Sequence, residues 1–501
     1  MTALVHPYGI LSRICFVVLL LLGGTSSVWA SVTSVSFKPT VVYGGNEEKI
    51  LITLSDPAGP GGQFVTLGST PALAGLPSSV QVPAGQSTVQ IVVTAVPVDT
   101  QVSVLVQAGT DSFEASNTLT VAPAIVAVVG VHDPVVFGGS TPAGVVILTG
   151  DAGPAGLQVD LTSNASDASV PANLTVPPGQ RQGIFPVTTT PVVSQTVATI
   201  AAKIAGVGTN CTLTINPPGL LSSTGSVASV IGGNQMFITI RLQGPAPKGG
   251  IDVSVTSPDP VTNVTTTAHV PPNVSFVGVS FTPLGVDATV NANVSVSYNG
   301  VTQLVPVAIA RAHISSMTYT FPTIVGGYAT NGLIMMDGAV GSTPRTVTLT
   351  PNDADESMQA TVNVPAQSKQ VLFAVNTNGV AADKTVGCDA VSDAITKSGS
   401  LQILHATALS ATPSVSSIVG GGNLTVTIRL NGKAPAGGLT FTLGSDNSHA
   451  TVPATVKIPA GALIVAFNVR TSSTGSVSTP VVITCTGPAG VGSVTANVTV
   501  N

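Results

Sequence analysis

The stretch Val41-Val42-Tyr43-Gly44-Gly45 decides the fold, because its glycine pair returns four more times at one fixed interval. Each later pair lies 94 residues after the one before it, as from 44 to 138. The later pairs are Gly138-Gly139, Gly232-Gly233, Gly326-Gly327 and Gly420-Gly421. A constant interval of this length indicates one folding unit copied in tandem. The 501 residues therefore predict five copies of one unit.

Apolar residues two positions apart follow every pair, eight and ten residues after its first glycine. They are Ile52/Leu54, Val146/Leu148, Ile240/Leu242, Ile334/Met336 and Ile428/Leu430. A step of two is the period of a β-strand, because successive side chains point to opposite faces of a sheet. The polar Thr53 between the first two predicts a strand with one buried and one exposed face.

The first copy predicts seven short strands and no amphipathic helix. The strands are Thr33–Lys38, Glu48–Ser55, Gln63–Ser69, Ser79–Val82, Gln86–Ala95, Gln101–Ala108 and Ser116–Val121. Val82-Pro83, which has a counterpart in every copy, marks a strand end, because proline has no N–H for a ladder. Seven strands with Gly and Pro turns in about 95 residues are typical of a Greek-key β-sandwich. Each glycine pair is predicted to form a turn, kink or bulge.

Residues 1–30 have the features of a secretory signal peptide. Arg13 precedes the apolar run Ile14–Leu22, and Val28-Trp29-Ala30 supplies small residues for cleavage. The run is too short to span a bilayer comfortably, and an uncleaved anchor is the weaker alternative. We therefore predict an extracellular or cell-surface protein with no integral membrane span after cleavage.

The chain carries few charges. Its net charge is −5, and 7% of its residues are charged, against about 25% in ordinary domains. No basic patch is visible, so nucleic acid is excluded as a partner. Cys211, Cys388 and Cys485 occupy unmatched positions in their copies, which predicts buried hydrophobic residues and no disulfide framework.

No pattern predicts catalytic, cofactor-binding or metal-binding residues, and we predict that the chain is not an enzyme and needs no cofactor. The histidines share no position among the copies: His132, His269, His313, His405 and His449. The acidic stretch Asn352–Glu356 is interpreted as a solvated turn, with a Ca²⁺ loop as the less favoured alternative. Recurring aromatic residues such as Phe185 fall on core positions, which leaves little for an exposed sugar-binding platform.

The motifs resemble those of bacterial immunoglobulin-like repeats. The resemblance rests on the apolar-Gly-Gly turns, on Val82-Pro83-Ala84-Gly85 and Ile458-Pro459-Ala460-Gly461, and on the closing strand Leu119-Thr120-Val121. Such repeats, which include invasin/intimin-type and fibronectin III-like modules, occur in secreted and surface proteins. The resemblance implies an all-β chain of five tandem immunoglobulin-like Greek-key β-sandwich domains in an extended array. After the signal peptide at 1–30, repeats 1 to 5 are predicted at 31–122, 123–216, 217–310, 311–404 and 405–501.

Three functions follow from these expectations. The first is a non-enzymatic secreted or surface-displayed stalk, since short joints between repeats predict a rod on the order of 150–200 Å long. The alternative is an adhesin or ligand-binding module that uses inter-strand loops, with a cell-envelope or neighbouring-cell protein or glycan as partner. Repeat 4, with its acidic stretch and Arg345, is the nearest candidate for such loops. An accessory chain of an extracellular enzyme is less favoured.

Overall fold

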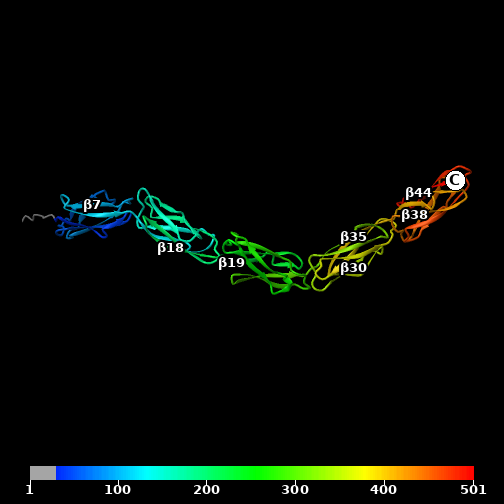
Figure 1. Ribbon diagram of the computed structural model, residues 1–501, viewed down its shortest axis with the longest axis horizontal. Helices are drawn as coiled ribbons and strands as arrows, with labels where there is room; N and C mark the ends of the chain where they lie inside the picture. Colours follow the sequence, from blue (N-terminus) through cyan, green and yellow to red (C-terminus); the bar gives the residue numbers. More distant parts are fainter. Residues whose placement is uncertain (1–29) are drawn as a thin grey trace, which may run out of the picture. The chain divides into compact units, whose positions relative to one another are not determined.

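The computed structural model describes residues 30–501, and these residues form an all-β structure (Figure 1). They fall into two compact units divided between Pro217 and Pro218, close to the predicted boundary between repeats 2 and 3. The predicted fold class is confirmed, while the exact boundaries of the five repeats stay a prediction. The predicted signal peptide lies outside the described residues except for Ala30.

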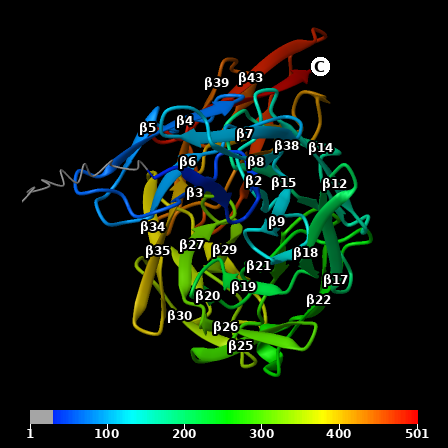
Figure 2. The same cartoon turned by 90° about the vertical axis from the view of Figure 1, so that its left-hand side faces the viewer.

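Repeat 1 consists of two sheets packed on one core. The first sheet has the order β1-β3-β6, with β1 (Val32–Phe37), β3 (Glu47–Leu54) and β6 (Thr88–Thr94). The second has the order β2-β8-β7-β4-β5, with β2 (Val41–Tyr43), β4 (Gln63–Thr70), β5 (Ser79–Val82), β7 (Val102–Gly109) and β8 (Ala115–Ala122). Figure 2 shows β4 beside β5, which forms one edge of this sheet.

Repeat 2 repeats this arrangement and adds a short strand pair. Its first sheet is β15-β11-β9, with β9 (Val126–Val131), β11 (Ala143–Leu148) and β15 (Gln182–Pro186). Its second is β10-β18-β17-β12-β14, with β10 (Val135–Phe137), β12 (Leu157–Ser163), β14 (Asn173–Val176), β17 (Thr196–Ile204) and β18 (Val207–Asn216). The added pair is β13 (Ala168–Ser169) with β16 (Thr188–Thr189).

Repeat 3 replaces the added strand pair by the 3-10 turn η1 (Pro260–Thr262). Its first sheet is β19-β21-β24, with β19 (Leu220–Gly225), β21 (Met236–Leu242) and β24 (Phe276–Phe281). Its second is β20-β26-β25-β22-β23, with β20 (Ser229–Ile231), β22 (Ile251–Thr256), β23 (Thr265–Val270), β25 (Val290–Tyr298) and β26 (Val301–Ala310).

Repeats 4 and 5 extend the first sheet to four strands. In repeat 4 it is β27-β29-β33-β31, with β27 (Ile314–Tyr319), β29 (Ala329–Met336), β31 (Glu356–Met358) and β33 (Gln370–Thr377). Its second sheet is β28-β35-β34-β30-β32, with β28 (Thr323–Val325), β30 (Arg345–Pro351), β32 (Thr361–Val364), β34 (Lys384–Ser392) and β35 (Ile395–Leu404).

Repeat 5 has the same arrangement as repeat 4. Its first sheet is β36-β38-β42-β40, with β36 (Ala408–Pro413), β38 (Asn423–Leu430), β40 (Ala450–Thr451) and β42 (Ile464–Thr471). Its second sheet is β37-β44-β43-β39-β41, built from β37 (Ser417–Ile418), β39 (Leu439–Ser445), β41 (Thr455–Ile458), β43 (Thr479–Thr486) and β44 (Ser493–Val500).

One short strand per repeat was missed by the sequence prediction. In repeat 1 it is β2, which ends at Tyr43 just before the glycine pair and pairs in parallel with the last strand, β8. The counterparts β10, β20, β28 and β37 also pair in parallel with the last strand of their repeat. A strand of two or three residues is too short to show a period of its own.

The glycine pairs form turns, as predicted, and a different constraint requires glycine at each of the two positions. The second glycine has a positive φ in every repeat, for example 79° at Gly45 and 94° at Gly421, which residues with a side chain rarely adopt. The first lies against the backbone of a later loop, and a Cβ at Gly44 would overlap Pro97. The turn therefore needs glycine at both places.

The predicted core positions lie in the core. The five residues eight places after the first glycine, from Ile52 to Ile428, are each 0% exposed. Val65 and its counterparts Val159, Val253, Val347 and Phe441 are fully buried as well. They join the two sheets of a repeat into one hydrophobic cluster.

Ala30 belongs to the first sandwich and not only to the predicted leader. Its side chain is buried, its N–H donates to Gln63 Oε1 at 3.1 Å, and its carbonyl accepts from Gln63 Nε2 at 2.6 Å. The same position holds a buried alanine in repeats 2, 4 and 5, namely Ala124, Ala312 and Ala406. Ala30 therefore packs with repeat 1, next to the predicted boundary at Ser31.

Candidate functional site

The acidic stretch of repeat 4 is neutralised by a lysine from a neighbouring strand. Lys384, the first residue of β34, places Nζ 2.9 Å from Asp353 Oδ2 and 2.8 Å from Asp355 Oδ2. The bond from Lys384 lowers the pKa of Asp353. No group of three potential metal ligands converges here or elsewhere in residues 30–501. The interpretation as a Ca²⁺ loop therefore gains no support from the geometry.

Arg345, the other predicted recognition residue of repeat 4, is also engaged within its own repeat. Its guanidinium pairs with the Asp393 carboxylate, and Arg311 lies 3.6 Å from the same carboxylate. The charges that made repeat 4 the nearest candidate for a binding loop are thus paired with other residues of the same repeat.

A carboxyl, a phenol and a thiol meet in the core of repeat 4. Glu356 is 2% exposed and accepts a hydrogen bond from the Tyr319 hydroxyl, while its second oxygen has no protein partner. Burial raises the pKa of Glu356 and also that of Tyr319. Burial, with a smaller contribution from the Glu356 charge, raises the pKa of Cys388 to about 11. The equivalent of Glu356 is the buried Ala168 in repeat 2.

This cluster has acid–base groups but no route for a substrate. Tyr319 and Cys388 are 6% and 1% exposed, so a ligand reaches none of the three groups without opening the sandwich. A thiol with a raised pKa stays protonated and is a poor nucleophile. The arrangement has the features of a buried polar pair and not of a catalytic centre.

The histidines do not converge, and four of the five lie beside an aspartate. His132 pairs with Asp133, His269 with Asp252, His313 with Asp337 and His405 with Asp383. His405, at the joint between repeats 4 and 5, places Nδ1 2.6 Å from Asp383 Oδ1 and Nε2 3.1 Å from the Gly490 carbonyl. The Gly490 carbonyl and then Asp383 raise the pKa of His405, because the charged ring donates to both.

The cysteines follow the prediction of buried hydrophobic residues in two cases. Cys388 and Cys485 lie in their cores, and burial raises the pKa of Cys485 to about 11. Cys211 on β18 is half-buried. All three are free thiols.

Within each unit, successive repeats are joined by the same backbone hydrogen bond. An N–H of the later repeat donates to the carbonyl oxygen of the first glycine of the pair. The bonds are Asp151 to Gly44 (2.8 Å) in the first unit, and Ala339 to Gly232 (2.8 Å) and Lys433 to Gly326 (2.9 Å) in the second. The residue before each donor is a glycine, and a Cβ at Gly338 would overlap the Gly232 oxygen. Sequence analysis missed this contact, although Gly150, Gly338 and Gly432 share one repeat position.

Side chains reinforce the joints that follow repeats 1 and 3. Asn46 Nδ2 donates to the Thr149 carbonyl at 3.0 Å, and Asn234 Nδ2 donates in the same way to Asp337 at 2.9 Å. Asp99 Oδ1 accepts from the Ala155 N–H at 3.1 Å. Its counterpart Asp287 accepts from the hydroxyls of Ser342 and Thr343 at 2.8 and 2.7 Å.

Gln367 adds a clamp that is specific to the joint between repeats 3 and 4. Its Oε1 accepts from the Gly285 N–H at 2.8 Å, and its Nε2 donates to the Gly285 carbonyl at 3.1 Å. Its φ of 57° lies in the left-handed region. Glycine holds this position in repeats 1, 2 and 5, so the two side-chain bonds offset a backbone strain of about 1–2 kcal/mol.

Some aromatic residues outside the recurring positions are exposed, although the sequence left little for a sugar-binding platform. Among residues 30–501, six have exposed side chains: Phe64, Phe113, Phe237, Phe276, Phe321 and Tyr328. The recurring core residues Phe185, Phe373 and Phe467 are buried, as predicted. The exposed aromatic residues lie at positions that are not aromatic in the other repeats, so comparison of the repeats did not predict whether they are buried or exposed. The alternation Met236-Phe237-Ile238 was the available signal, because it puts the ring on the solvent face of a strand.

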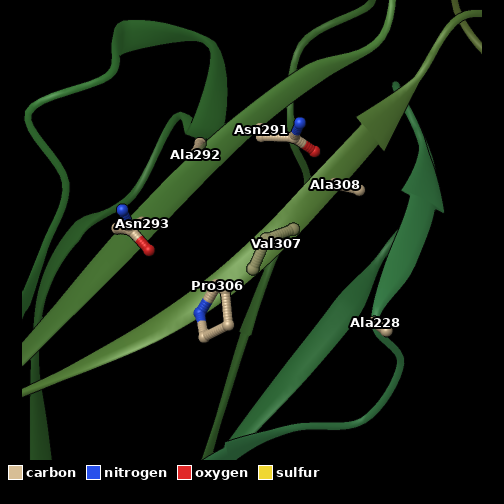
Figure 3. A pocket seen from close by; sticks show the side chains of 7 residues that line it. All are labelled: Ala228, Asn291, Ala292, Asn293, Pro306, Val307 and Ala308. Carbon is tan, nitrogen blue, oxygen red and sulfur yellow. The ribbon is translucent and has the colours of Figure 1, made fainter.

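Repeat 3 also has a shallow hollow of about 290 Å³ on its second sheet (Figure 3). Its labelled residues come from β25, from β26 and from Ala228 beside β20. Asn291 and Asn293 supply the polar groups, whereas Pro306 and Ala308 supply an apolar floor. The hollow holds no charged or titratable group.

The two-sheet topology and the parallel short strand identify the architecture. The chain consists of tandem immunoglobulin-like β-sandwich repeats. No protein-family model matches it, and no curated protein matches it. Among the residues described, no helix is long and apolar enough for a membrane span.

Solved structures of similar architecture include adhesion proteins. The D0-D1 domain of intimin covers 37% of this chain and 98% of its own length, at 12% identity and a TM-score of 0.17. The Escherichia coli adhesin FdeC covers 56% of this chain and 98% of its own length, at 9% identity and a TM-score of 0.22. A tetra-tandem repeat from the extending region of a large adhesion protein covers 74% and 98%, at 17% identity and a TM-score of 0.21. Because these TM-scores are low, the assignment of the immunoglobulin-like fold rests on the sheet topology of the chain itself.

Proposed function

We propose that the chain is an exported, cell-surface or extracellular spacer built from five immunoglobulin-like repeats. The observation that carries the proposal is the recurring hydrogen bond to the first glycine of a pair, at Gly44, Gly232 and Gly326. A backbone bond between successive domains restricts their rotation about the joint, whereas a flexible linker would leave them free. Repeats joined in this way transmit position and orientation along the chain, as a spacer requires.

The composition supports the same function. Only 7% of residues are charged, and the arginine and acidic residues of repeat 4 pair with partners inside the repeat. Export and the repeat boundaries at 31–122, 123–216, 217–310, 311–404 and 405–501 are part of the proposal, with Ala30 added to repeat 1. The prediction that the chain is not an enzyme stays a prediction.

Small-angle X-ray scattering of the chain from Ala30 onward tests the spacer. We expect a maximum dimension that is unchanged between low and high salt, because backbone bonds and not surface charges hold the joints. Replacing both Gly338 and Gly432 by valine is expected to reduce that dimension, since a side chain there separates the bonded backbones. Equal dimensions for the two proteins would contradict the proposal.

An adhesive role is the second candidate, and the exposed rings of repeat 3 favour it. Saturable retention of the purified chain on isolated envelope or on intact neighbouring cells tests it. Absence of binding to either surface would reject adhesion to those partners and leave the spacer intact.

A further inference from the structure

The outer face of the β19-β21-β24 sheet combines aromatic, hydroxyl and cationic side chains. Its strands alternate, so that Met236, Ile238 and Ile240 fill the core while their neighbours face solvent. The outward-facing residues of β21 and β24 include Phe237, Thr239, Arg241, Phe276, Gly278 and Ser280. Phe237 and Phe276 are 48% and 53% exposed. We refer to these six residues as the Phe237 face.

Strand register fixes how the residues of the Phe237 face lie. Arg241 is opposite Phe276, Thr239 opposite Gly278 and Phe237 opposite Ser280. Four residues along a strand place the backbone of Phe237 about 14 Å from that of Arg241. Nothing lies within 4 Å of a Cβ built on Gly278, so the floor between the two ends is open. The face therefore has a ring at one end, a cation at the other and a low hydroxyl-lined floor between them.

Phe276 holds the cation in place. The Arg241 guanidinium lies 5.8 Å from the centre of the Phe276 ring, within the range of a cation–π interaction. No carboxylate among residues 30–501 lies within ion-pair distance of Arg241, in contrast to Arg181, Arg311 and Arg345. A guanidinium in this position presents its planar fork of donors to solvent and is well suited to a carboxylate.

We propose that the Phe237 face binds an acidic oligosaccharide, one whose sugar rings carry carboxylates. The apolar C–H face of a sugar ring stacks on Phe237, because the face of a phenyl ring is electron-rich. A carboxylate further along the same saccharide pairs with Arg241, and ring hydroxyls exchange hydrogen bonds with Thr239 and Ser280. Phe276 is a positioning residue, since it acts through Arg241.

A saccharide fits better than a protein partner for two reasons. The apolar groups of the face are separate, with Thr239 and Gly278 between the phenyl ring of Phe237 and the Arg241–Phe276 pair. Protein interfaces instead favour a contiguous apolar centre that excludes water. Hydroxyl groups and an unpaired arginine match the alternating C–H faces, hydroxyls and carboxylates of a uronate chain.

Repeat 5 supplies a natural control. The corresponding face has the same threonine and arginine, at Thr427 and Arg429, with Arg429 opposite Ile464. Thr425 stands in place of Phe237, and Ile464 in place of Phe276. Repeats 1, 2 and 4 have Thr53, Ile147 and Met335 at the arginine position. The full set of groups therefore occurs in repeat 3.

Isothermal titration of the chain from Ala30 onward with three hexasaccharides tests the proposal. The probes are oligogalacturonate, oligoguluronate and hyaluronan, each with its carboxyl methyl ester. We expect at least one free acid to bind, and its methyl ester to bind about tenfold or more weakly, because a charge-assisted hydrogen bond is lost. F237T and R241Q are each expected to lower the affinity by a similar factor, and R241K to give an intermediate loss because it keeps the charge without the fork.

Matched variants separate binding from folding. R429Q in repeat 5 is expected to change nothing, and F237T/F276I should remove binding while the thermal midpoint stays near that of the parent, since both rings are exposed. T425F/I464F/A466G/N468S, added to that variant, should restore binding on repeat 5, because it supplies all six groups of the Phe237 face. Equal affinity for acid and ester, or binding that survives both F237T and R241Q, would overturn the proposal. So would failure of all three saccharides to bind, or tighter binding of a Glu/Asp-rich peptide than of any saccharide, which would indicate a protein partner.

The inference goes beyond the spacer and does not depend on it. G338V and G432V change the dimensions of the chain if the spacer is correct, whereas F237T changes saccharide binding without altering any joint.

Discussion

The joint between repeats 3 and 4 and the joint between repeats 4 and 5 share one backbone bond and the close glycine contacts beside it, but they differ in the side chains that reinforce them. In the first, the Asn234 amide donates a hydrogen bond, the Asp287 carboxylate accepts one, and the Gln367 amide does both. The second has Tyr328 and Ala381 where the first has Asn234 and Asp287, and adds His405 instead. The backbone bond thus sets the position of the next repeat, and a few side chains set how firmly it is held.

The difference follows an alternation among repeats 1 to 4. Repeats 1 and 3 share the asparagine and the aspartate at the joint, as in Asn46 and Asp99. Repeats 2 and 4 instead share a threonine whose hydroxyl accepts from the second glycine of the pair, Thr189 with Gly139 and Thr377 with Gly327. Repeat 5 has the same threonine, Thr471, so the alternation does not extend beyond repeat 4.

The largest expected effect comes from adding a side chain at the shared backbone contact. G338V or G432V should destabilise its own joint by about 1–3 kcal/mol, because the Cβ overlaps the facing repeat. Amide hydrogen exchange at Ala339 and Lys433 measures the loss of protection. G437A is the control, since nothing lies within 4 Å of its new Cβ. Unchanged protection in both valine variants would show that the backbone bond does not hold the joint.

Transferring the stronger joint should stiffen the weaker one. In Y328N/A381D, the new amide is placed to donate to the Asn431 carbonyl and the new carboxylate to accept from the Gly437 N–H, as Asn46 and Asp99 do in repeat 1. We expect a gain of about 1–2 kcal/mol in joint stability, measured as slower exchange at Lys433. Y328A, which removes the tyrosine side chain without adding the bonds, should show no gain.

Removing the Gln367 clamp should have opposing effects that nearly cancel in overall stability. Q367G loses two hydrogen bonds, each worth about 1 kcal/mol, and relieves a left-handed strain of similar size. We expect little change in the thermal midpoint but faster exchange at the Gly285 amide. A large fall in the midpoint without faster exchange at Gly285 would assign Gln367 to the folding of repeat 4 and not to the joint.

The smallest effect is a pH dependence confined to the joint between repeats 4 and 5. The pKa of His405 is raised in the folded protein above its ordinary value of 6.5. Its contribution is therefore complete below pH 6.5 and is lost as the pH rises through the raised value. The protection factor of the amides near Gly490 should fall over that range in the parent but not in H405Q, while the protection factor of Ala339 stays unchanged in both.

The sequence allowed prediction of the parts of the fold that repeat. The seven strands of repeat 1 and the buried residues from Ile52 to Ile428 are confirmed, because burial imposes the same period on every copy. The joints were missed because their contacts bring together residues about 100 positions apart, as with Asn234 and Asp337. Phe237 was missed for the opposite reason, since a residue present in one repeat leaves no periodic signal.

The short strand before each glycine pair has a mechanical consequence. β28 runs parallel to β35, the last strand of repeat 4, through the pairs Thr323–Gln402, Ile324–Ile403 and Val325–Leu404. Tension on the chain pulls the start of β28 and the end of β35 in opposite directions along their length. All the hydrogen bonds between the two strands then bear the force at the same time, in shear. If the strands were pulled apart from one end, the bonds would break one after another. Each repeat therefore has a parallel strand pair that resists stretching close to the end of its last strand.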